Sequence, residues 1–261
     1  MSEGEGIEFL KSSSALVFQV IHGTYGEDGT LVELLEKNEI PFIGSNAEVM
    51  RVTINKLETE KLLAKNNIVV PKSAEVFSIH SIDISDFTFP LIVKPKDEGS
   101  SVSLFKVHSE KELLEVLEQS LEKHKSMLVQ EFVEGREFTC GVVELDGIAT
   151  PLTPTEIILT KSDVFDYDAK YTVGGCEEIT PAQVSELILQ KLQELAQQVH
   201  IICGCKDISR TDMIMKSDGT IVILEINTIP GMTRTSFIPA QLKASSYTLK
   251  EFVEGMLVKY E

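Results

Sequence analysis

The sequence predicts a mixed α/β (α+β) fold, because apolar runs of strand length alternate along the chain with stretches of helical periodicity. An Asp-Gly pair at residues 218–219 lies between two alternating apolar runs, which is the strongest short-range signal for a β-hairpin. The chain has 261 residues, of which 43% are hydrophobic, so it can bury a sizeable core. We expect one multi-lobed domain or two to three small ones.

In the N-terminal half, the apolar run at residues 15–21 predicts a buried strand, and a glycine-rich loop leads from it into a helix over residues 30–37. A turn at Pro41 and Gly44 precedes a second helix at residues 47–65, which ends before Pro71. Residues 89–94 then predict a strand that leaves a turn.

In the C-terminal half, leucines and valines at helical spacing predict an amphipathic helix at residues 110–123. Strands are expected at residues 128–133 and 137–145. The polar segment 156–178 has weak periodicity, and a connection of that length is usually a functional loop or lid. The remaining elements are a helix at 181–199, the Asp-Gly hairpin and a last amphipathic helix at 249–260.

Composition excludes several classes of protein. The net charge of −17 would repel nucleic acid phosphates. No apolar run reaches the roughly eighteen residues of a membrane span, and the first five residues lack the basic and apolar regions of a signal peptide. The four cysteines are few, and Cys203 and Cys205 have no matching second pair for zinc. These features predict a cytoplasmic protein without a nucleic acid or membrane partner.

The hairpin places charged residues together. A two-residue turn at residues 218–219 sets a register in which Asp212 lies opposite Glu225 and Arg210 lies opposite Asn227, all on one face. The other face would carry the apolar side chains of both strands, Met213, Met215, Val222, Leu224 and Ile226.

Two carboxylates placed opposite each other have Cβ atoms about 5 Å apart and repel, so the pair needs a reason to exist. A hard divalent cation is one reason, because magnesium takes oxygen ligands, including an amide oxygen such as that of Asn227. The alternative is an acidic pair that faces solvent.

Lysines elsewhere supply the opposite charge. Lys94 ends a predicted strand and is followed by a Gly-Ser-Ser loop, residues 99–101, whose N–H and hydroxyl groups could cradle phosphate oxygens. Taken alone, this loop could be a surface turn, and Lys56 and Lys170 could be solvent-exposed. Together with the carboxylate pair, they provide every charge that an ATP·Mg site needs.

At this point the sequence resembles the ATP-grasp ligases and, among them, the D-alanine–D-alanine ligases. The resemblance runs from His22 to the C-terminus and keeps the order and approximate spacing of the motifs, which makes it far more specific than any one glycine-rich match. The matching strings are His22-Gly23 with residues 26–29, residues 92–95 with 99–101, and residues 135–138, 165–171, 210–212 and 225–233, ending at Ser236.

The resemblance implies an ATP-grasp fold with two α/β lobes that grip ATP, plus a truncated N-terminal α/β lobe. The expected division is residues 1–50 for the remnant of the substrate lobe, 51–134 for the small ATP-grasp lobe and 135–261 for the catalytic lobe. The cofactors it implies are ATP and two magnesium or manganese ions. The partners it implies are two D-alanine molecules and a second copy of the chain in a homodimer.

The resemblance also implies a role for individual residues. The ATP-binding residues are Lys56, Lys94, Lys170 and Ser101 for the phosphates, Gln130, Glu131 and Val133 for the adenine and Glu137 for the ribose. The metal ligands are Asp212, Glu225 and Asn227. The catalytic residues are Arg210 and the Gly231 N–H as oxyanion donors, Ser100 in the loop over the γ-phosphate and Tyr171, which favours an amine acceptor. The substrate residues are His22 beside the first D-alanine and Ser236 at the carboxylate of the second.

The expected activity is ligation of two D-alanines to D-alanyl-D-alanine, through an acyl phosphate, for peptidoglycan precursor synthesis. Relative to the family, we expect the first strand and its glutamate to be missing ahead of Ser2, which would expose a sheet edge. The chain would then be truncated, completed by dimerisation or an ATP-binding protein without ligase activity. A further alternative is another acceptor, D-serine or D-lactate.

Overall fold

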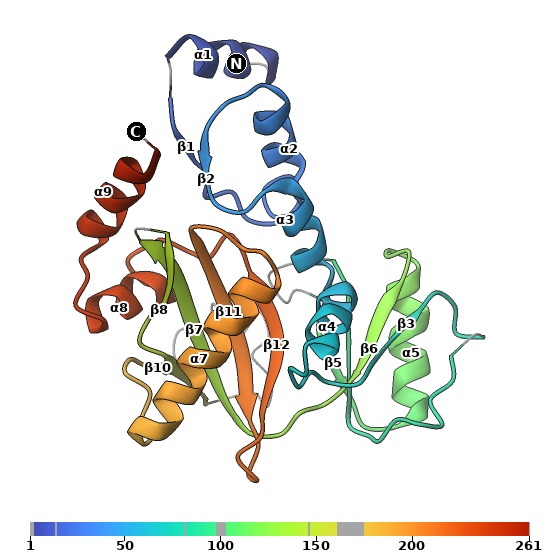
Figure 1. Cartoon of the computed structure of the whole chain (residues 1–261). Coiled ribbons are helices and arrows are strands. Elements are labelled where there is room, and N and C mark those ends of the chain that lie inside the picture. The colour runs from blue at the N-terminus through green and yellow to red at the C-terminus, as the bar shows by residue number, and fades with distance from the viewer. Residues whose placement is uncertain are drawn as a thin grey trace.

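Three β-sheets organise the computed structural model, which describes residues 3–13, 15–80, 82–97, 103–145, 147–160 and 175–260. In Figure 1 a small N-terminal unit lies above two larger α/β lobes. Among the described residues, no helix is both long and apolar enough to cross a bilayer.

The N-terminal unit contains α1 (Glu3–Ser13), β1 (Val17–Phe18), α2 (Thr30–Lys37), β2 (Phe42–Ile43) and α3 (Ala47–Ile54). Its strands β1 and β2 pair in parallel, and within the described chain β1 has β2 as its one strand partner. The expected strand at residues 15–21 is therefore too long. Val20 and Ile21 lie beyond β1 and are about half exposed, at 51% and 46%.

The small lobe contains α4 (Lys56–Lys65), β3 (Ser73–Val76), β4 (Leu91–Lys94), β5 (Phe105–Val107), α5 (Glu110–Leu121) and β6 (Met127–Glu131). The strand order is β3-β6-β4-β5, and all pairs are antiparallel. The buried leucines of α5, Leu113 and Leu117, pack against the sheet, as their helical spacing predicts. Helix α4 contacts this lobe through β3 and the large lobe through β12 and α7.

The helix expected at residues 47–65 is broken at Asn55, which has an extended backbone (φ −82°, ψ 97°). The Asn55 side chain caps α4 by accepting a hydrogen bond from the Glu58 N–H at 3.3 Å. The Lys56 N–H donates to the Lys96 carbonyl oxygen at 2.9 Å, at the end of β4. The break thus joins the first turn of α4 to the small-lobe sheet.

The large lobe contains β7 (Arg136–Leu145), β8 (Ile148–Pro151), β9 (Thr155–Leu159), β10 (Cys176–Ile179), α7 (Glu186–Ile202), β11 (Ile208–Met215), β12 (Ile221–Asn227), α8 (Phe237–Ala244) and α9 (Leu249–Tyr260). The strand order is β10-β9-β7-β11-β12, with β8 on β7. Helix α7 crosses one face of this sheet in Figure 1. The core under α7 takes alternate residues of β7, Phe138, Cys140 and Val142. On the opposite face, α8 and α9 cover Val143, which leaves Glu137 and Thr139 at the other end of β7 for a site.

The expectation of one long loop at residues 156–178 is wrong at both ends. Residues 155–159 form β9 and residues 176–179 form β10, and the two strands pair antiparallel. The intervening residues 161–174 lie outside the described part of the chain.

Candidate active site

The hairpin of β11 and β12 has a three-residue loop, and the predicted two-residue turn is wrong. The Lys216 N–H donates to the Thr220 oxygen and the Gly219 N–H donates to the Lys216 oxygen, both at 2.9 Å. Gly219 has φ 83°, the left-handed conformation that the third position of such a loop requires. The register next to the loop is therefore shifted by one residue, so that Met215 pairs with Ile221.

A second irregularity shifts the register back. A break between Asp212 and Met213 leaves Leu224 as the extra residue of β12. Beyond it, Asp212 lies opposite Glu225 and Arg210 lies opposite Asn227, so the predicted pairing of the charged residues is confirmed.

The predicted apolar face of the hairpin is only partly correct. Met213, Met215 and Ile226 do pack into the core under α7. On β12, however, the neighbouring residues Ile221 and Ile223 occupy that core in place of Val222 and Leu224, because the three-residue loop shifts the strand by one position.

Asp212 is held by three hydrogen bonds. The Arg210 guanidinium donates to both of its carboxylate oxygens, from Nε at 2.9 Å and from Nη2 at 2.8 Å. The Thr139 hydroxyl, on β7, donates to Asp212 Oδ1 at 2.5 Å. Asp212 is 8% exposed and Thr139 is fully buried, so the orientation of this carboxylate is fixed on a rigid sheet.

The second carboxylate connects the two lobes. Glu225 Oε2 lies 3.5 Å from the Nζ of Lys56, at the start of α4. On the same face, Asn227 Oδ1 accepts a hydrogen bond from the Ile229 N–H at 2.8 Å, which orients its amide at the end of β12. The lysine expected to bind phosphate and a carboxylate expected to bind metal therefore meet across the gap between the lobes.

These residues suit a hard divalent cation. Two carboxylates and one amide oxygen share a face, and cationic side chains already balance the carboxylates, Arg210 on Asp212 and Lys56 on Glu225. Within the described residues, no cluster of three or more His, Cys, Asp or Glu side chains forms a self-contained metal site. Such a set fits an ion that also binds the phosphates of a nucleotide, which supply the remaining oxygens.

Arg210 lies in a mostly buried position between an acidic and an aromatic neighbour. Its guanidinium carbon is 5.4 Å from the centre of the Phe237 ring, in a cation–π contact. Burial opposes its charge, but Asp212, Glu225 and Glu27 together raise the pKa of Arg210 above its ordinary value. The side chain is therefore a permanent cation at the site.

Glu27 is a site residue that the sequence analysis missed. Its carboxylate accepts a hydrogen bond from the Gly23 N–H at 3.0 Å and lies 3.3 Å from His22 Nδ1. The charge of Glu27 also helps to raise the pKa of Arg210 on the hairpin of the large lobe. Only its place in the Gly-Glu-Asp-Gly string could have suggested this role.

Gly231 and Ser236 lie against each other in the loop after β12. A Cβ atom at Gly231 would lie 2.6 Å from Ser236 Oγ, so only glycine permits this approach. Ser236 Oγ accepts a hydrogen bond from the Thr233 N–H at 3.1 Å and lies 2.8 Å from the Thr233 hydroxyl. The predicted oxyanion donor and the predicted carboxylate-binding serine thus share one compact loop.

On the small lobe, Lys94 and Gln130 lie in the buried interior and form a hydrogen bond of 3.0 Å from Lys94 Nζ to Gln130 Oε1. Glu131 follows on β6, where its N–H donates to the Lys72 oxygen at 2.9 Å. Val133 is half-buried after the strand ends. The adenine roles expected of these residues stay predictions.

Glu137 shares the site face of the large sheet with Asp212. It pairs with Ile214 on β11 and with Ile157 on β9. On β10, Glu178 was not foreseen, because its strand was expected to be a loop. Glu178 pairs with Ile157, the β9 partner of Glu137, so its side chain lies on the same face of the sheet as Glu137. Burial raises the pKa of Glu178, and the charge of Arg210 opposes that shift.

Four predicted site residues, Ser100, Ser101, Lys170 and Tyr171, lie outside the described residues. Their expected roles stay predictions.

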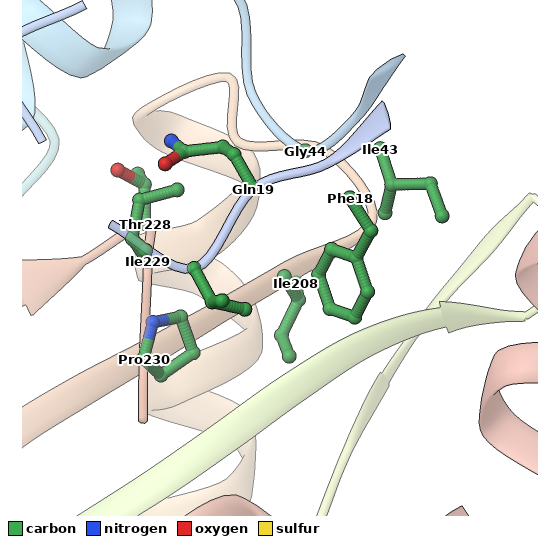
Figure 2. Close-up of a pocket in the computed structure, with 9 residues that line it drawn as sticks. Phe18, Gln19, Ile43, Gly44, Ile208, Thr228, Ile229 and Pro230 are labelled. Carbon is green, nitrogen blue, oxygen red and sulfur yellow. The ribbon is translucent and has the colours of Figure 1, made fainter. Parts of the chain in front are cut away.

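An apolar hollow lies where the N-terminal unit contacts the large lobe (Figure 2). Phe18, Ile43 and Ile208 point into it, and Ile229 and Pro230 close it on the side that leads to Gly231. Its space of about 250 Å³ includes open solvent. Its lining is mostly apolar, and Gln19 and Thr228 are its polar side chains.

Comparison with known proteins agrees with this geometry. The chain matches the family described as D-ala D-ala ligase C-terminus over residues 62–258. It is 36% identical over 255 residues to a D-alanine–D-alanine ligase of Thermotoga maritima, covering 96% of this chain and 82% of that protein.

Solved structures agree as well. The VanG D-Ala:D-Ser ligase from Enterococcus faecalis has a TM-score of 0.86 and 32% identity, over 94% of this chain and 73% of that one. The D-alanine–D-alanine ligase from Bacillus anthracis complexed with ATP has a TM-score of 0.83 and 24% identity, over 99% and 83% of the two chains.

Two α/β lobes, one with buried lysines and one with a carboxylate hairpin, define an ATP-grasp protein, and the solved structures share that fold. The expected fold is thereby confirmed. The chain belongs to the D-alanine–D-alanine ligase family, whose members are enzymes that form carbon–nitrogen bonds.

Proposed function

We propose that this protein ligates two D-alanine molecules to D-alanyl-D-alanine at the expense of ATP, for peptidoglycan precursor synthesis. Family membership supports the reaction. The structural observation that carries it is the contact of Lys56 with Glu225, 3.5 Å apart, beside the Arg210–Asp212 pair. This contact supports the proposal, because it joins the lysine expected to bind phosphate to a carboxylate expected to bind metal, at the junction of two lobes.

In this proposal ATP binds between the lobes. Lys56, Lys94 and Lys170 contact its phosphates, and Ser100 and Ser101 belong to the loop over the γ-phosphate. The segment with Gln130, Glu131 and Val133 reads the adenine, and Glu137 binds the ribose hydroxyls. Asp212, Glu225 and Asn227 would hold two magnesium or manganese ions, which neutralise phosphate charge when bound.

The chemistry proceeds in two steps. A carboxylate oxygen of the first D-alanine, beside His22, attacks the γ-phosphorus, ADP leaves and an acyl phosphate forms. The amine of the second D-alanine, held at its carboxylate by Ser236, then attacks the acyl carbon. Arg210 and the Gly231 N–H donate hydrogen bonds to the oxyanion of the tetrahedral intermediate, which expels phosphate and leaves the amide.

We further propose the division into lobes at residues 1–50, 51–134 and 135–261, and a homodimer. The position of one sheet in each of these three segments supports the division, and helix α3, at residues 47–54, runs across its first boundary. Sedimentation velocity tests the homodimer, and a clean monomer would contradict it.

The second candidate activity uses another acceptor. The similarity to a D-Ala:D-Ser ligase favours D-serine as the alternative acceptor, whereas Tyr171 favours D-alanine by resemblance to the family. D-Lactate would replace the amide by an ester and is expected to be the poorest acceptor.

The test measures phosphate release from ATP with magnesium, with and without D-alanine, and identifies the product by mass spectrometry. Parallel samples contain D-alanine with D-serine or with D-lactate. D-Alanyl-D-alanine as the main product would support the proposal, and D-alanyl-D-serine would support the second candidate. ATP binding without phosphate release under any of these conditions would overturn both in favour of an ATP-binding protein without ligase activity.

A further inference from the structure

A buried polar cluster connects α4 to the sheet of the small lobe. Glu60 on α4 is 5% exposed, and its Oε1 accepts a hydrogen bond of 2.6 Å from Gln130 Nε2 on β6. Gln130 Nε2 also donates to Ser73 Oγ on β3, at 3.1 Å. Gln130 Oε1 accepts the bond of 3.0 Å from Lys94 Nζ on β4. The amide of Gln130 is therefore bonded at both ends.

The charges of Glu60 and Lys94 allow only one orientation of the Gln130 amide. A carboxylate can only accept a hydrogen bond, and an ammonium group can only donate one. Between Glu60 and Lys94, the NH₂ of Gln130 must face Glu60 and its oxygen must face Lys94. Reversing the amide would put its NH₂ against the ammonium and its oxygen against the carboxylate, which would leave two buried charges unpaired.

We propose that Glu60 is a positioning residue for Lys94, which it holds in place through the Gln130 amide. This inference rests on the proposed function, in which Lys94 contacts the phosphates of ATP. Glu60, Gln130 and Lys94 are buried and are joined by hydrogen bonds. These bonds fix the position of the Lys94 ammonium group while the nucleotide is absent. The ammonium is then pre-organised, and binding ATP costs less conformational entropy.

The same cluster restricts what Gln130 can do. Both hydrogens of its amide have acceptors, and its oxygen has a charged donor. The Gln130 side chain therefore has no hydrogen-bonding group left for the adenine. Any contact of residues 130–133 with the adenine must come from their main chain or from the other side chains.

Glu60 also carries a cost in stability. Burial raises the pKa of Glu60, while Ser73, Lys94, Gln130 and Lys56 oppose that shift. A carboxylate whose pKa is raised by folding weakens the fold at neutral pH, because the unfolded chain ionises it more readily. A residue retained only for stability would not weaken the fold in this way. Removing the charge of Glu60 should therefore not lower stability, but it should lower the affinity for the nucleotide.

The decisive variant is Glu60→Gln, which keeps the shape and removes the charge that orients Gln130. We expect affinity for the non-hydrolysable analogue AMP-PNP with magnesium, measured by calorimetry, to fall about tenfold, the loss typical of one charge-assisted hydrogen bond. Affinity for AMP, which lacks the β- and γ-phosphates, should be unchanged. The midpoint of thermal unfolding should not fall. The matched control is Glu58→Gln, an exposed position on the same helix.

Two single and two double variants make the test specific. Lys94→Met should weaken AMP-PNP binding, and adding Glu60→Gln to it should cause no additional loss. Glu60→Lys should weaken binding more than Glu60→Gln, and Gln130→Glu added to Glu60→Lys should restore most of it, because the new carboxylate would lie between two ammonium groups.

The outcomes separate the inference from the proposed function. Normal AMP-PNP binding by Glu60→Gln, together with weak binding by Lys94→Met, would overturn the inference and leave the phosphate role of Lys94 intact. Normal binding by Lys94→Met would overturn both. An equal loss for AMP and AMP-PNP would also overturn the inference, because it would place the cluster at the adenine or in general stability.

Discussion

Arg210 has two partners that make it hard to replace. It neutralises Asp212 through two hydrogen bonds and packs on the Phe237 ring. The proposed reaction requires a third contact of the same guanidinium, with the oxyanion. Because this pair is buried and fixed on a strand, its geometry need not reorganise during the reaction.

Arg210→Ala should therefore reduce turnover severely. Loss of one oxyanion donor typically costs ~3 kcal/mol, or roughly 100-fold in rate. Steady-state phosphate release with D-alanine measures it, and Arg51→Ala, an exposed arginine paired with Glu33, is the control. A folded Arg210→Ala protein with near-wild-type release would exclude this residue from the reaction.

Glu225→Gln should weaken metal binding without unfolding the protein. The change removes one anionic oxygen from the expected ligand set, and hard cations prefer charged oxygen ligands. Electron paramagnetic resonance of free Mn²⁺ in the presence of ATP measures the affinity, and we expect a fall of about tenfold, in line with loss of a charged ligand. The exposed Glu177→Gln is the control. Unchanged Mn²⁺ affinity would remove Glu225 from the ligand set.

Gly231→Ala tests the loop that carries the proposed oxyanion donor, Gly231, and the proposed carboxylate-binding residue, Ser236. The new Cβ atom would lie 2.6 Å from Ser236 Oγ, so the serine must move away from Thr233. We expect KM for the second D-alanine to rise several-fold, while the affinity for AMP-PNP stays the same. Gly6→Ala, where a Cβ meets no neighbour within 4 Å, is the control. A lower kcat with unchanged KM would instead point to the oxyanion donor alone.

At the scale of elements, the hairpin shows what local sequence can predict. Asp-Gly correctly predicted a turn, but it fits both a two-residue and a three-residue loop, and the choice of two was wrong. The bulge at Leu224 offsets the shift, so Asp212 still meets Glu225. The pairing that matters for chemistry was thus predicted correctly from an incorrect turn, while the assignment of Val222 and Leu224 to the core failed.

Contacts between residues far apart in the sequence explain the other differences between the predicted and the observed structure. The helical pattern over residues 47–65 is continuous. Next to its break at Asn55, the Lys56 N–H donates to the carbonyl oxygen of Lys96, which lies 40 positions after Lys56. The Glu60–Gln130 bond joins residues 70 positions apart. Such contacts leave no local signature, whereas periodicity and turn residues do, which is why most elements and the pairing of Asp212 with Glu225 were predicted correctly.

Helix α7 carries a buried histidine that makes the fold sensitive to acid. His200 is fully buried, with Nδ1 2.7 Å from Ser209 Oγ and Nε2 3.4 Å from Glu144 Oε1. Burial lowers the pKa of His200, although Glu144 and Asp207 oppose this and Lys259 reinforces it. The neutral ring is therefore the native form.

The expected pH dependence follows from that direction. The unfolded chain takes up a proton on His200 below about pH 6.5, whereas the folded protein does so only at lower pH. The free energy of unfolding should then fall as pH drops below about 6.5, by at most ~1.4 kcal/mol per pH unit from this group. His200→Asn should flatten this slope in urea titrations, unlike the exposed His108→Asn. An unchanged slope in His200→Asn would contradict the assignment.

At the scale of the whole molecule, Asp207 connects three distant segments. It is fully buried before β11 and accepts a hydrogen bond from the Gly44 N–H at 2.7 Å, in the N-terminal unit. From α9, Lys259 forms an ion pair with it and the Tyr260 hydroxyl donates to it at 2.5 Å. The N-terminal unit and the C-terminal helix α9 thus meet at one carboxylate of the large lobe.

Asp207→Asn should weaken this connection throughout the molecule. The substitution keeps the size of the side chain but leaves Lys259 without one of its two carboxylate partners, and breaking a buried ion pair typically costs about 3 kcal/mol. Urea unfolding, monitored by circular dichroism, should show a lower midpoint. Hydrogen exchange should show reduced protection in both β2 and α9, because each is anchored by the same carboxylate. The exposed Asp86→Asn is the control. If only α9 lost protection, Gly44 would not depend on this anchor. Other contacts would then hold the N-terminal unit on the large lobe, such as the hydrogen bond from the Lys206 N–H to Ser45 Oγ and the apolar cluster that Ile43 shares with Ile208.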